Sequence, residues 1–349
     1  MTVSGTRGII RVAVNPECEV LAAMTADKVR EPEFYRAVMG EEYPKEYGER
    51  DSARRRGAKF EANLFENDAA PLRAALAPVL GVDASELTVR NFDDEVPGTG
   101  DARRLHRTRG VFDDLAQGRP VPDILIQAHL ELVAPRAAAR WIVKPDLLVL
   151  DRGRNRYVPG DAKSFIVRDG VGAPGDLRGT RLQIAVAIVA LDAEMERIGL
   201  DAGPPQGLLQ FALPFGLAPA KPVLESLEAD VANVRVALNA ISAVRFRVAE
   251  LRLLEDSPLP VLVDELAIAY RDSCHTSCVM TRFCRQRTGD SVAILGDELA
   301  AAVGPEFTLD RVMRLLRADP TTLEGVEKSI ALRLKQGAEI LGLDLTEVA

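Results

Sequence analysis

Residues 144–165, KPDLLVLDRGRNRYVPGDAKSF, decide the fold that we expect for this chain. Two largely apolar segments flank a short polar turn, which is typical of a β-hairpin. A glycine at the first position of a two-residue loop favours a type II′ turn, so the pattern places Gly153 and Arg154 in the loop. In that register Asp146 and Asp161 are directly opposed, and opposed Cβ atoms lie about 4.5–5.5 Å apart.

Lys163 follows Asp161 by two residues, so strand alternation puts both side chains on one face. Two carboxylates this close repel each other unless a cation lies between them or one is protonated. Mg²⁺ and Mn²⁺ prefer oxygen ligands, and such a metal polarises a phosphoryl group and lowers the pKa of a bound water. A lysine beside the metal can orient the attacking hydroxide. The trio therefore indicates metal-assisted phosphodiester hydrolysis, and the alternative is a chance acidic pair on a solvated hairpin.

Outward from this hairpin, periodicity predicts an α/β chain with helical additions. Strands are expected at 124–133, 141–150 and 156–167, as a three-stranded meander, and at 208–213. Helices are expected at 52–65, 177–198, 225–255, 261–270, 309–317 and 323–341.

Composition is that of a folded protein, with 47% hydrophobic and 28% charged residues among 349. Its net charge of −8 argues against a surface that is positive throughout. No apolar run approaches the roughly 18 residues of a membrane span, and residues 1–16 do not form a secretory signal. A cytoplasmic protein without a membrane partner is expected.

The middle of the chain is basic, because residues 101–181 contain 15 Lys and Arg against 10 Asp and Glu, a local charge of +5. Two groups contribute: Arg103, Arg104, Arg107 and Arg109 before the first strand, and Arg152, Arg154 and Arg156 around the hairpin turn. They either track phosphates or decorate solvated loops, and both interpretations stay open. His106 and His129 are expected on the surface or a strand face, without a chemical role.

Pro-Asp on one strand and Asp-x-Lys on the next resembles the core of the PD-(D/E)XK nucleases. The strand DILIQA (123–128) and Gln183 on the following helix resemble the RecB-like branch of that family. The branch usually has a tyrosine four residues after this glutamine, where this chain has Ala187. It often has a histidine in its first helix, where residues 55–61 offer Glu61 instead.

The resemblance implies a restriction-endonuclease-like core, a mixed sheet flanked by helices. It implies that Asp146 and Asp161 bind Mg or Mn, together with Glu61 and the Ala162 carbonyl. Lys163 would act at the attacking water, and Gln183 would orient that water or contact DNA. Without the resemblance, Glu61 is equally a solvated helix residue.

The only cysteines are Cys18, Cys274, Cys278 and Cys284. Cys274 and Cys278 are four apart and can share a helical face. All four can close one tetrahedral site, and the spacing does not separate zinc from an iron–sulfur cluster. The alternative is that Cys18 is merely buried and the other three are incidental.

One cysteine before the core and three after it resembles the iron–sulfur RecB-like nucleases, including the AddB type and the CRISPR-associated type. This resemblance implies a four-iron–four-sulfur cluster with a mainly structural role, as a staple between the two ends of the core. The first gap of the cysteine motif is three residues here and commonly two in that branch.

The domains expected are residues 1–60 with the first cluster cysteine, 61–215 as nuclease core, 216–290 with the three-cysteine motif, and a helical tail at 291–349. The function implied is a metal-dependent nuclease acting on single-stranded DNA or DNA ends, as an exonuclease. It would work in defence, CRISPR adaptation, recombination or repair, beside other proteins of those systems. The alternative is a catalytically weak, nuclease-derived DNA-binding or scaffold subunit.

Overall fold

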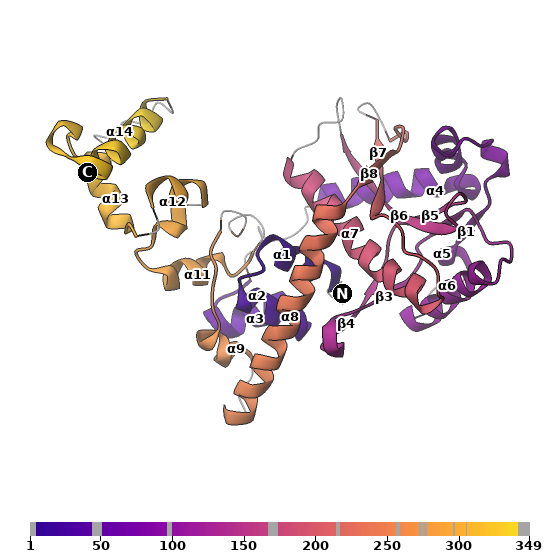
Figure 1. Ribbon diagram of the computed structural model, residues 1–349, viewed down its shortest axis with the longest axis horizontal. Helices are drawn as coiled ribbons and strands as arrows, with labels where there is room; N and C mark the ends of the chain where they lie inside the picture. Colours follow the sequence, from indigo (N-terminus) through magenta and orange to yellow (C-terminus); the bar gives the residue numbers. More distant parts are fainter. Residues whose placement is uncertain are drawn as a thin grey trace. The chain divides into compact units, whose positions relative to one another are not determined.

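The computed structural model describes residues 5–43, 51–95, 100–166, 174–213, 217–255, 259–271, 274, 278–295, 297–304 and 306–340 (Figure 1). The chain divides into two compact units. The first consists of Met1–Phe34 and Gly48–Ala267, and the second of Tyr35–Tyr47 and Ile268–Ala349. Among the described helices, none has both the length and the apolar character that crossing a bilayer requires.

A mixed β-sheet is the centre of the first unit. Within the described residues it has six strands in the order β1-β2-β5-β6-β7-β8. Neighbours pair antiparallel except β1 with β2 and β6 with β7, which are parallel. The strands are β1 (Val89–Asn91), β2 (Ile124–Ile126), β5 (Leu147–Asp151), β6 (Arg156–Ile166), β7 (Gln206–Ala212) and β8 (Val223–Ser226). The predicted α/β class is therefore confirmed.

A second, two-stranded sheet is formed by β3 (Leu130–Val133) and β4 (Arg140–Val143). Its register continues that of β2 with β5, since Ile126 pairs with Leu147 and Leu130 with Val143. The two predicted strands at 124–133 and 141–150 are thus one antiparallel ribbon, interrupted in the middle. Gln127, at φ +55°, breaks one side, and Pro145, which has no N–H to donate, lies on the other.

Helix α4 (Asp51–Leu80) covers one face of the main sheet. Its apolar side chains Phe60, Leu64, Leu72 and Leu76 are buried in one cluster with the strand residues Ile124, Ile126, Leu147, Val149, Ala162 and Leu208. The helix is interrupted at Glu66–Ala69, where the backbone leaves helical geometry. The predicted helix at 52–65 is the part before this interruption.

Helix α7 (Pro174–Arg197) covers the opposite face, because Leu208 points into the α4 cluster and its neighbour Gly207 must point away from it. A Cβ atom on Gly207 would lie 2.5 Å from Ile184 of α7 and 2.6 Å from Leu227. Only glycine therefore permits this close approach of helix and strand. The predicted helix at 177–198 and strand at 208–213 correspond to α7 and β7.

Further helices complete the first unit. The long helix α8 (Glu228–Glu255) packs against α1 (Gly5–Val14), α2 (Glu19–Ala26) and α7 (Figure 1). Helix α6 (Asp101–Ala116) packs against β3 and α7. Shorter elements are α3 (Glu31–Met39, which continues into the second unit), α5 (Phe92–Glu95), α9 (Leu259–Leu262), and the 3-10 turns η1 (Ala84–Glu86), η2 (Pro135–Ala137) and η3 (Val263–Glu265).

The second unit is helical in its described part. It contains α11 (Thr281–Thr288), η4 (Val292–Leu295), α12 (Asp297–Val303), α13 (Leu309–Arg317), η5 (Pro320–Thr322) and α14 (Gly325–Ile340). Its core gathers Val292, Val303, Phe307, Val312, Leu315, Ile330 and Ala331. Both helices predicted for the tail are confirmed.

Several predicted elements differ from the structure. The helix predicted at 261–270 is wrong, because α9 ends at Leu262 and one 3-10 turn follows. Strands β1 and β8 and helix α6 were not predicted. Helix α6 has many charged side chains and only a short apolar stripe. The hydrophobic periodicity that would predict this helix is therefore weak.

Candidate active site

The opposed aspartates sit where β5 begins and β6 runs past it. The ladder pairs Leu147 with Gly160 and ends at Asp151 with Arg156. Asp146 and Asp161 are the next positions on the two strands, so they face each other at the open end of the ladder. This is the register that the sequence predicts.

The turn that sets this register differs from the prediction. The strands are connected by residues 152–155, and Asn155, rather than Gly153, adopts a positive φ of +50°. The Asp151 carbonyl and its Oδ1 each accept a hydrogen bond from the Arg154 N–H at 3.2 Å. The loop is longer by one residue on each side of the predicted one, which leaves the pairing of the strands unchanged.

Asp161 is the buried member of the pair, with only 3% of its surface exposed. Burial raises the pKa of Asp161 well above the usual range and the negative charge of Asp146 adds to the rise, while Lys163 opposes it. The Lys163 Nζ lies 2.6 Å from Asp161 Oδ2. The Lys163 ammonium therefore pairs with this oxygen, and no other donor in the described part of the chain reaches it.

Asp146 is held by the main chain. Its Oδ2 accepts a hydrogen bond from the Ala162 N–H at 2.8 Å, and its carbonyl accepts one from the Gln127 N–H at 3.1 Å. The N–H and C=O of one strand residue point to the same side of the strand. We therefore expect the Ala162 carbonyl on the side of Asp146, as a metal ligand there would require.

Lys163 and Glu61 complete the charged group. Burial by itself would lower the pKa of Lys163, but the charges of Asp161 and Asp146 raise it, and Glu61 adds to the rise. Glu61 follows Phe60, which anchors α4 to the core under the sheet. The structure thus brings Glu61 into the electrostatic environment of the lysine, as the resemblance implies.

A cavity of about 430 Å³ opens beside Asp161 and Lys163, while Asp146 and Glu61 are not among the residues that line it. Asp161 and Lys163 line it from β6, and Gln183 lines it from α7. Ala187, one helical turn after Gln183, also lines it where the RecB-like branch usually has a tyrosine. The cavity therefore has room at the position that a tyrosine side chain would fill.

Two basic residues of this cavity were not singled out from the sequence. Arg7 of α1 and Lys144, just before β5, lie in its wall. Lys144 Nζ lies 2.8 Å from Asp101 Oδ1. Nothing in the sequence connects residue 7 with the hairpin, so only the packing of α1 could reveal it.

The acidic pair fits a divalent cation. Two facing carboxylates, one of them buried, repel each other and favour a bound cation, and Mg²⁺ typically binds one or two carboxylates and completes its shell with water or phosphate. Within the described residues, no group of three or more Asp, Glu, His or Cys side chains is arranged to hold a metal. Asp146, Asp161 and the Ala162 carbonyl are thus the residues that would hold it.

The cysteines divide between the two units, with Cys18 in the first and the other three in the second. All four are thiols, and Cys18, Cys274 and Cys284 are buried. The Cys274 carbonyl accepts a hydrogen bond from the Cys278 N–H at 3.0 Å, which is the spacing of one α-helical turn. Cys284 lies in α11.

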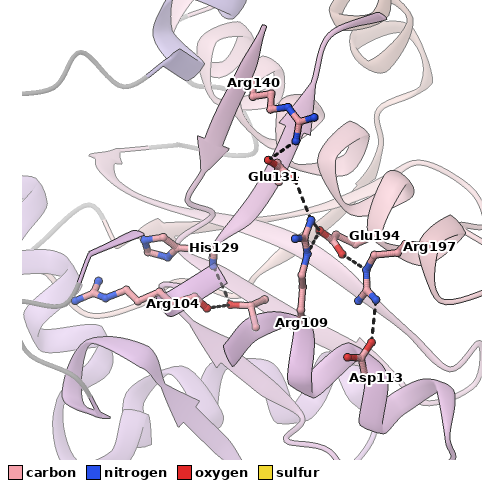
Figure 2. A network of polar contacts seen from close by, with 9 residues as sticks. Arg104, Arg109, Asp113, His129, Glu131, Arg140, Glu194 and Arg197 are labelled. Carbon is pink, nitrogen blue, oxygen red and sulfur yellow. Dashed lines mark hydrogen bonds and ion pairs between the residues drawn. The ribbon is translucent and has the colours of Figure 1, made fainter. Parts of the chain in front are cut away.

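Most arginines of the two predicted basic groups contact other parts of the protein. Figure 2 shows Arg109 of α6 between Glu131 and Glu194, while Arg197 contacts Glu194 and Asp113. The Glu194 carboxylate is 3% exposed and accepts hydrogen bonds at 2.8 Å from Arg109 Nε and 2.6 Å from Arg197 Nε. This network ties α6 and β3 to α7.

The hairpin arginines are likewise engaged. Arg152 donates to Asp123 at 2.7 Å. Arg156 is 4% exposed and donates to the carbonyls of Ala202 and Pro204. Arg152 could move onto a phosphate only by leaving the buried Asp123, and Arg156 only by leaving its own buried position.

The side chain of His129 is fully buried, so the surface alternative of the prediction is wrong for this residue. Its Nδ1 lies 3.1 Å from the Gln127 carbonyl, and its Nε2 lies 3.3 Å from Asp101 Oδ1. Burial lowers the pKa of His129 below its usual value, so the ring is neutral at pH 7. It packs at the interruption of the ribbon, opposite Lys144.

Comparisons with models of protein families, with curated proteins and with solved structures give no match for this chain.

Proposed function

We propose that this protein is a metal-dependent deoxyribonuclease of the RecB-like PD-(D/E)XK type. The observation that carries the proposal is the pair of opposed aspartates at the open end of the β5–β6 ladder, with Lys163 ion-paired to the buried member. Facing carboxylates favour a cation between them, and a cation beside a lysine suits hydrolysis of phosphate esters.

Each residue has a distinct role in this proposal. A bound Mg²⁺ or Mn²⁺ would supply Lewis acidity toward the phosphoryl group and a bound water of lowered pKa. Asp146 and Asp161 supply the carboxylate oxygens that would bind the metal ion. Lys163 stays protonated beside them and orients the attacking oxygen. Gln183 reaches the same cavity from α7 and is placed to hydrogen-bond water or DNA, and Glu61 is an additional acid.

The architecture supports the same proposal. Helix α4, the antiparallel strands β2, β5 and β6, helix α7 and the parallel strand β7 follow one another along the chain. The result is a mixed sheet with helices on both faces, as the resemblance implies. The biological setting that we propose is processing of DNA in defence, CRISPR adaptation, recombination or repair.

Cleavage of end-labelled single- and double-stranded DNA with Mg²⁺ or Mn²⁺ tests the proposal. Wild-type protein should cut DNA and EDTA should stop it, while Asp161→Asn should lose at least about a hundredfold in rate. Asp151→Asn is the matched control, since it makes the same substitution on the same hairpin at the other end of the ladder. Equal rates for wild type and Asp161→Asn would refute the nuclease assignment.

A second candidate is a nuclease-derived DNA-binding or scaffold subunit. It is favoured by the small number of acidic ligands, because the described residues contain no three-membered metal-holding group. In that case the wild type would bind DNA in the presence of Mn²⁺ and release intact strands. Binding without metal-dependent products separates the two candidates.

We also propose that the four cysteines bind a four-iron–four-sulfur cluster, with zinc as the alternative. Their donor chemistry fits both, and Cys274 and Cys278 are one helical turn apart. A reducing compartment, the cytoplasm, would keep these thiols available. Anaerobically purified protein should be brown, and Cys278→Ser should lose the bound iron and unfold at a lower temperature than the wild type. Colourless protein with one zinc per chain would favour zinc.

A further inference from the structure

A shallow basic groove lies on the first unit, apart from the candidate active site. Its walls include Lys28, Arg140, Arg245 and Arg252, and its volume is about 640 Å³. Asp27 is the acidic residue among those that line it. The protein as a whole carries a net charge of −8, so the local charge of this groove is opposite in sign to that of the whole chain.

The positive charge of the groove is only partly neutralised. Asp27 accepts from Arg252 at 2.6 Å, and Glu131 lies 3.4 Å from the largely exposed Arg140. Arg245 donates to the neutral carbonyl of Ala26 at 3.0 Å. Within the described residues, neither Lys28 nor Arg245 forms an ion pair with a carboxylate. An anionic ligand therefore meets uncompensated charge.

An exposed aromatic ring, in contact with Arg136, follows groove residue Arg245 on α8. Phe246 follows Arg245 on α8 and is 42% exposed, although it is large and apolar. The guanidinium of Arg136 lies 5.8 Å from the centre of its ring, and η2, which contains Arg136, leads directly into groove residues Ala138 and Ala139. Cationic grooves bordered by aromatic rings are typical of sites for single-stranded nucleic acid.

Strand β4 contributes one residue to this groove and another to the cavity that Asp161 lines, and strand alternation places those two side chains on opposite faces. Arg140, its first residue, lines the groove, and Val143, its last, lines the cavity. At about 3.3 Å per residue the two positions are about 10 Å apart along the strand. That is about three nucleotides at the 3.4 Å rise of B-form DNA, and fewer when a strand is stretched.

We propose that this groove binds the sugar–phosphate backbone of single-stranded nucleic acid, with a base stacked on Phe246. Binding to the groove stands by itself, and only its link to cleavage rests on the proposed nuclease function.

Fluorescence anisotropy of a labelled single strand of about 20 nucleotides, with EDTA present to prevent cleavage, tests the proposal. The double variant Lys28→Gln/Arg140→Gln removes two exposed cations and should weaken binding on the order of tenfold. The salt dependence of log K should become shallower by about 0.7 per lost phosphate contact. The control is Arg119→Gln/Lys221→Gln, two exposed cations elsewhere on the same unit, which should bind as wild type does.

Two further arms keep the outcome specific. Phe246→Leu should weaken single-strand binding about tenfold and leave duplex binding unchanged, since only unpaired bases can stack on the ring. An acidic polypeptide, used as competitor, should not displace the strand at equal charge concentration. Equal binding by both double variants, or displacement by that polypeptide, would overturn the proposal.

The two proposals fail separately. If the wild type binds the strand through the groove but releases no metal-dependent products, the nuclease assignment fails and the groove stands. If it cuts DNA and the groove variants neither bind more weakly nor raise the KM for long strands, the groove is refuted and the nuclease stands.

Discussion

At the scale of single residues, the candidate site is organised around a carboxylate in an unfavourable place. Asp161 is buried, it faces another acid, and within the described structure its Oδ2 is paired with the Lys163 ammonium alone. Such arrangements are costly for folding and common at functional sites. Substitution of Asp161 should therefore change the free energy of unfolding of the protein.

Asp161→Asn removes both the repulsion from Asp146 and the ion pair with Lys163, so its effect on the stability of the metal-free protein should shift in favour of the variant as the pH rises. The pKa of Asp161 is raised in the folded state, so the folded protein keeps a proton that the unfolded chain has released. The contribution of Asp161 to stability is consequently greatest below its unfolded pKa and falls as the pH rises toward its folded pKa. Denaturant unfolding in EDTA at several pH values measures it.

The difference in free energy of unfolding between wild type and Asp161→Asn separates the effect of Asp161 from that of the other acids of the chain. It should widen in favour of Asp161→Asn as the pH rises, whereas Asp151→Asn should show no such trend. Added Mn²⁺ should stabilise the wild type and not Asp161→Asn. A difference that is constant with pH would contradict the raised pKa.

Glu194→Gln should destabilise the first unit by about 2 kcal/mol. The change leaves Arg109 and Arg197 without the charge that they share, and breaking a fully buried pair typically costs about 3–5 kcal/mol. We expect less here because both arginines are about a third exposed. Glu196→Gln, an exposed position on the same helix, is the control, and equal midpoints of unfolding for both variants would contradict the prediction.

At the scale of elements, the close contact between α7 and β7 positions Gln183. Gly207→Ala should cost about 1–3 kcal/mol, because the added Cβ meets Ile184 and Leu227 well inside van der Waals distance. It should also reduce DNA cleavage, since Ile184 is next to Gln183 and both line the cavity.

Gly179→Ala is the control, because Gly179 lies on α7, the helix that Gly207 of β7 contacts. A Cβ there meets nothing within 4 Å, so this change should stabilise the helix by about 0.5–1 kcal/mol and leave cleavage unchanged. Thermal unfolding and cleavage rates of the two variants check both statements. Loss of stability in Gly179→Ala would contradict the prediction for this control.

The sequence predicts the elements whose hydrophobic period is long and regular. The register that opposes Asp146 to Asp161 was predictable because strand pairing is symmetrical about its turn, even though the turn itself was assigned wrongly. The interruption of the ribbon at Gln127 was not predictable, since a positive φ at a glutamine has no sequence signal. Arg7 reaches the cavity only through tertiary packing, and the burial of His129 depends on α6, whose apolar stripe is too short to detect.

At the scale of the whole molecule, each unit has a core of its own, and those cores share no residue. Leu315→Ala should therefore destabilise the second unit, by about 2–5 kcal/mol. Hydrogen exchange should show lost protection at 292–340 and unchanged protection in β2, β5 and β6. Parallel loss in both regions would mean that the units unfold as one.

The bent ribbon has a consequence for the order of folding. Strands β2 to β6 are neighbours in sequence and pair antiparallel, so their contacts close short loops. The parallel partners β1 and β7 must bridge longer segments, and they join later on the same reasoning. Asp146 and Asp161 thus meet while both are still open to water, and desolvation follows only when α7 docks. The free-energy cost of burying the two carboxylates therefore arises after the transition state for folding. A substitution that removes this cost should slow unfolding more than it speeds folding.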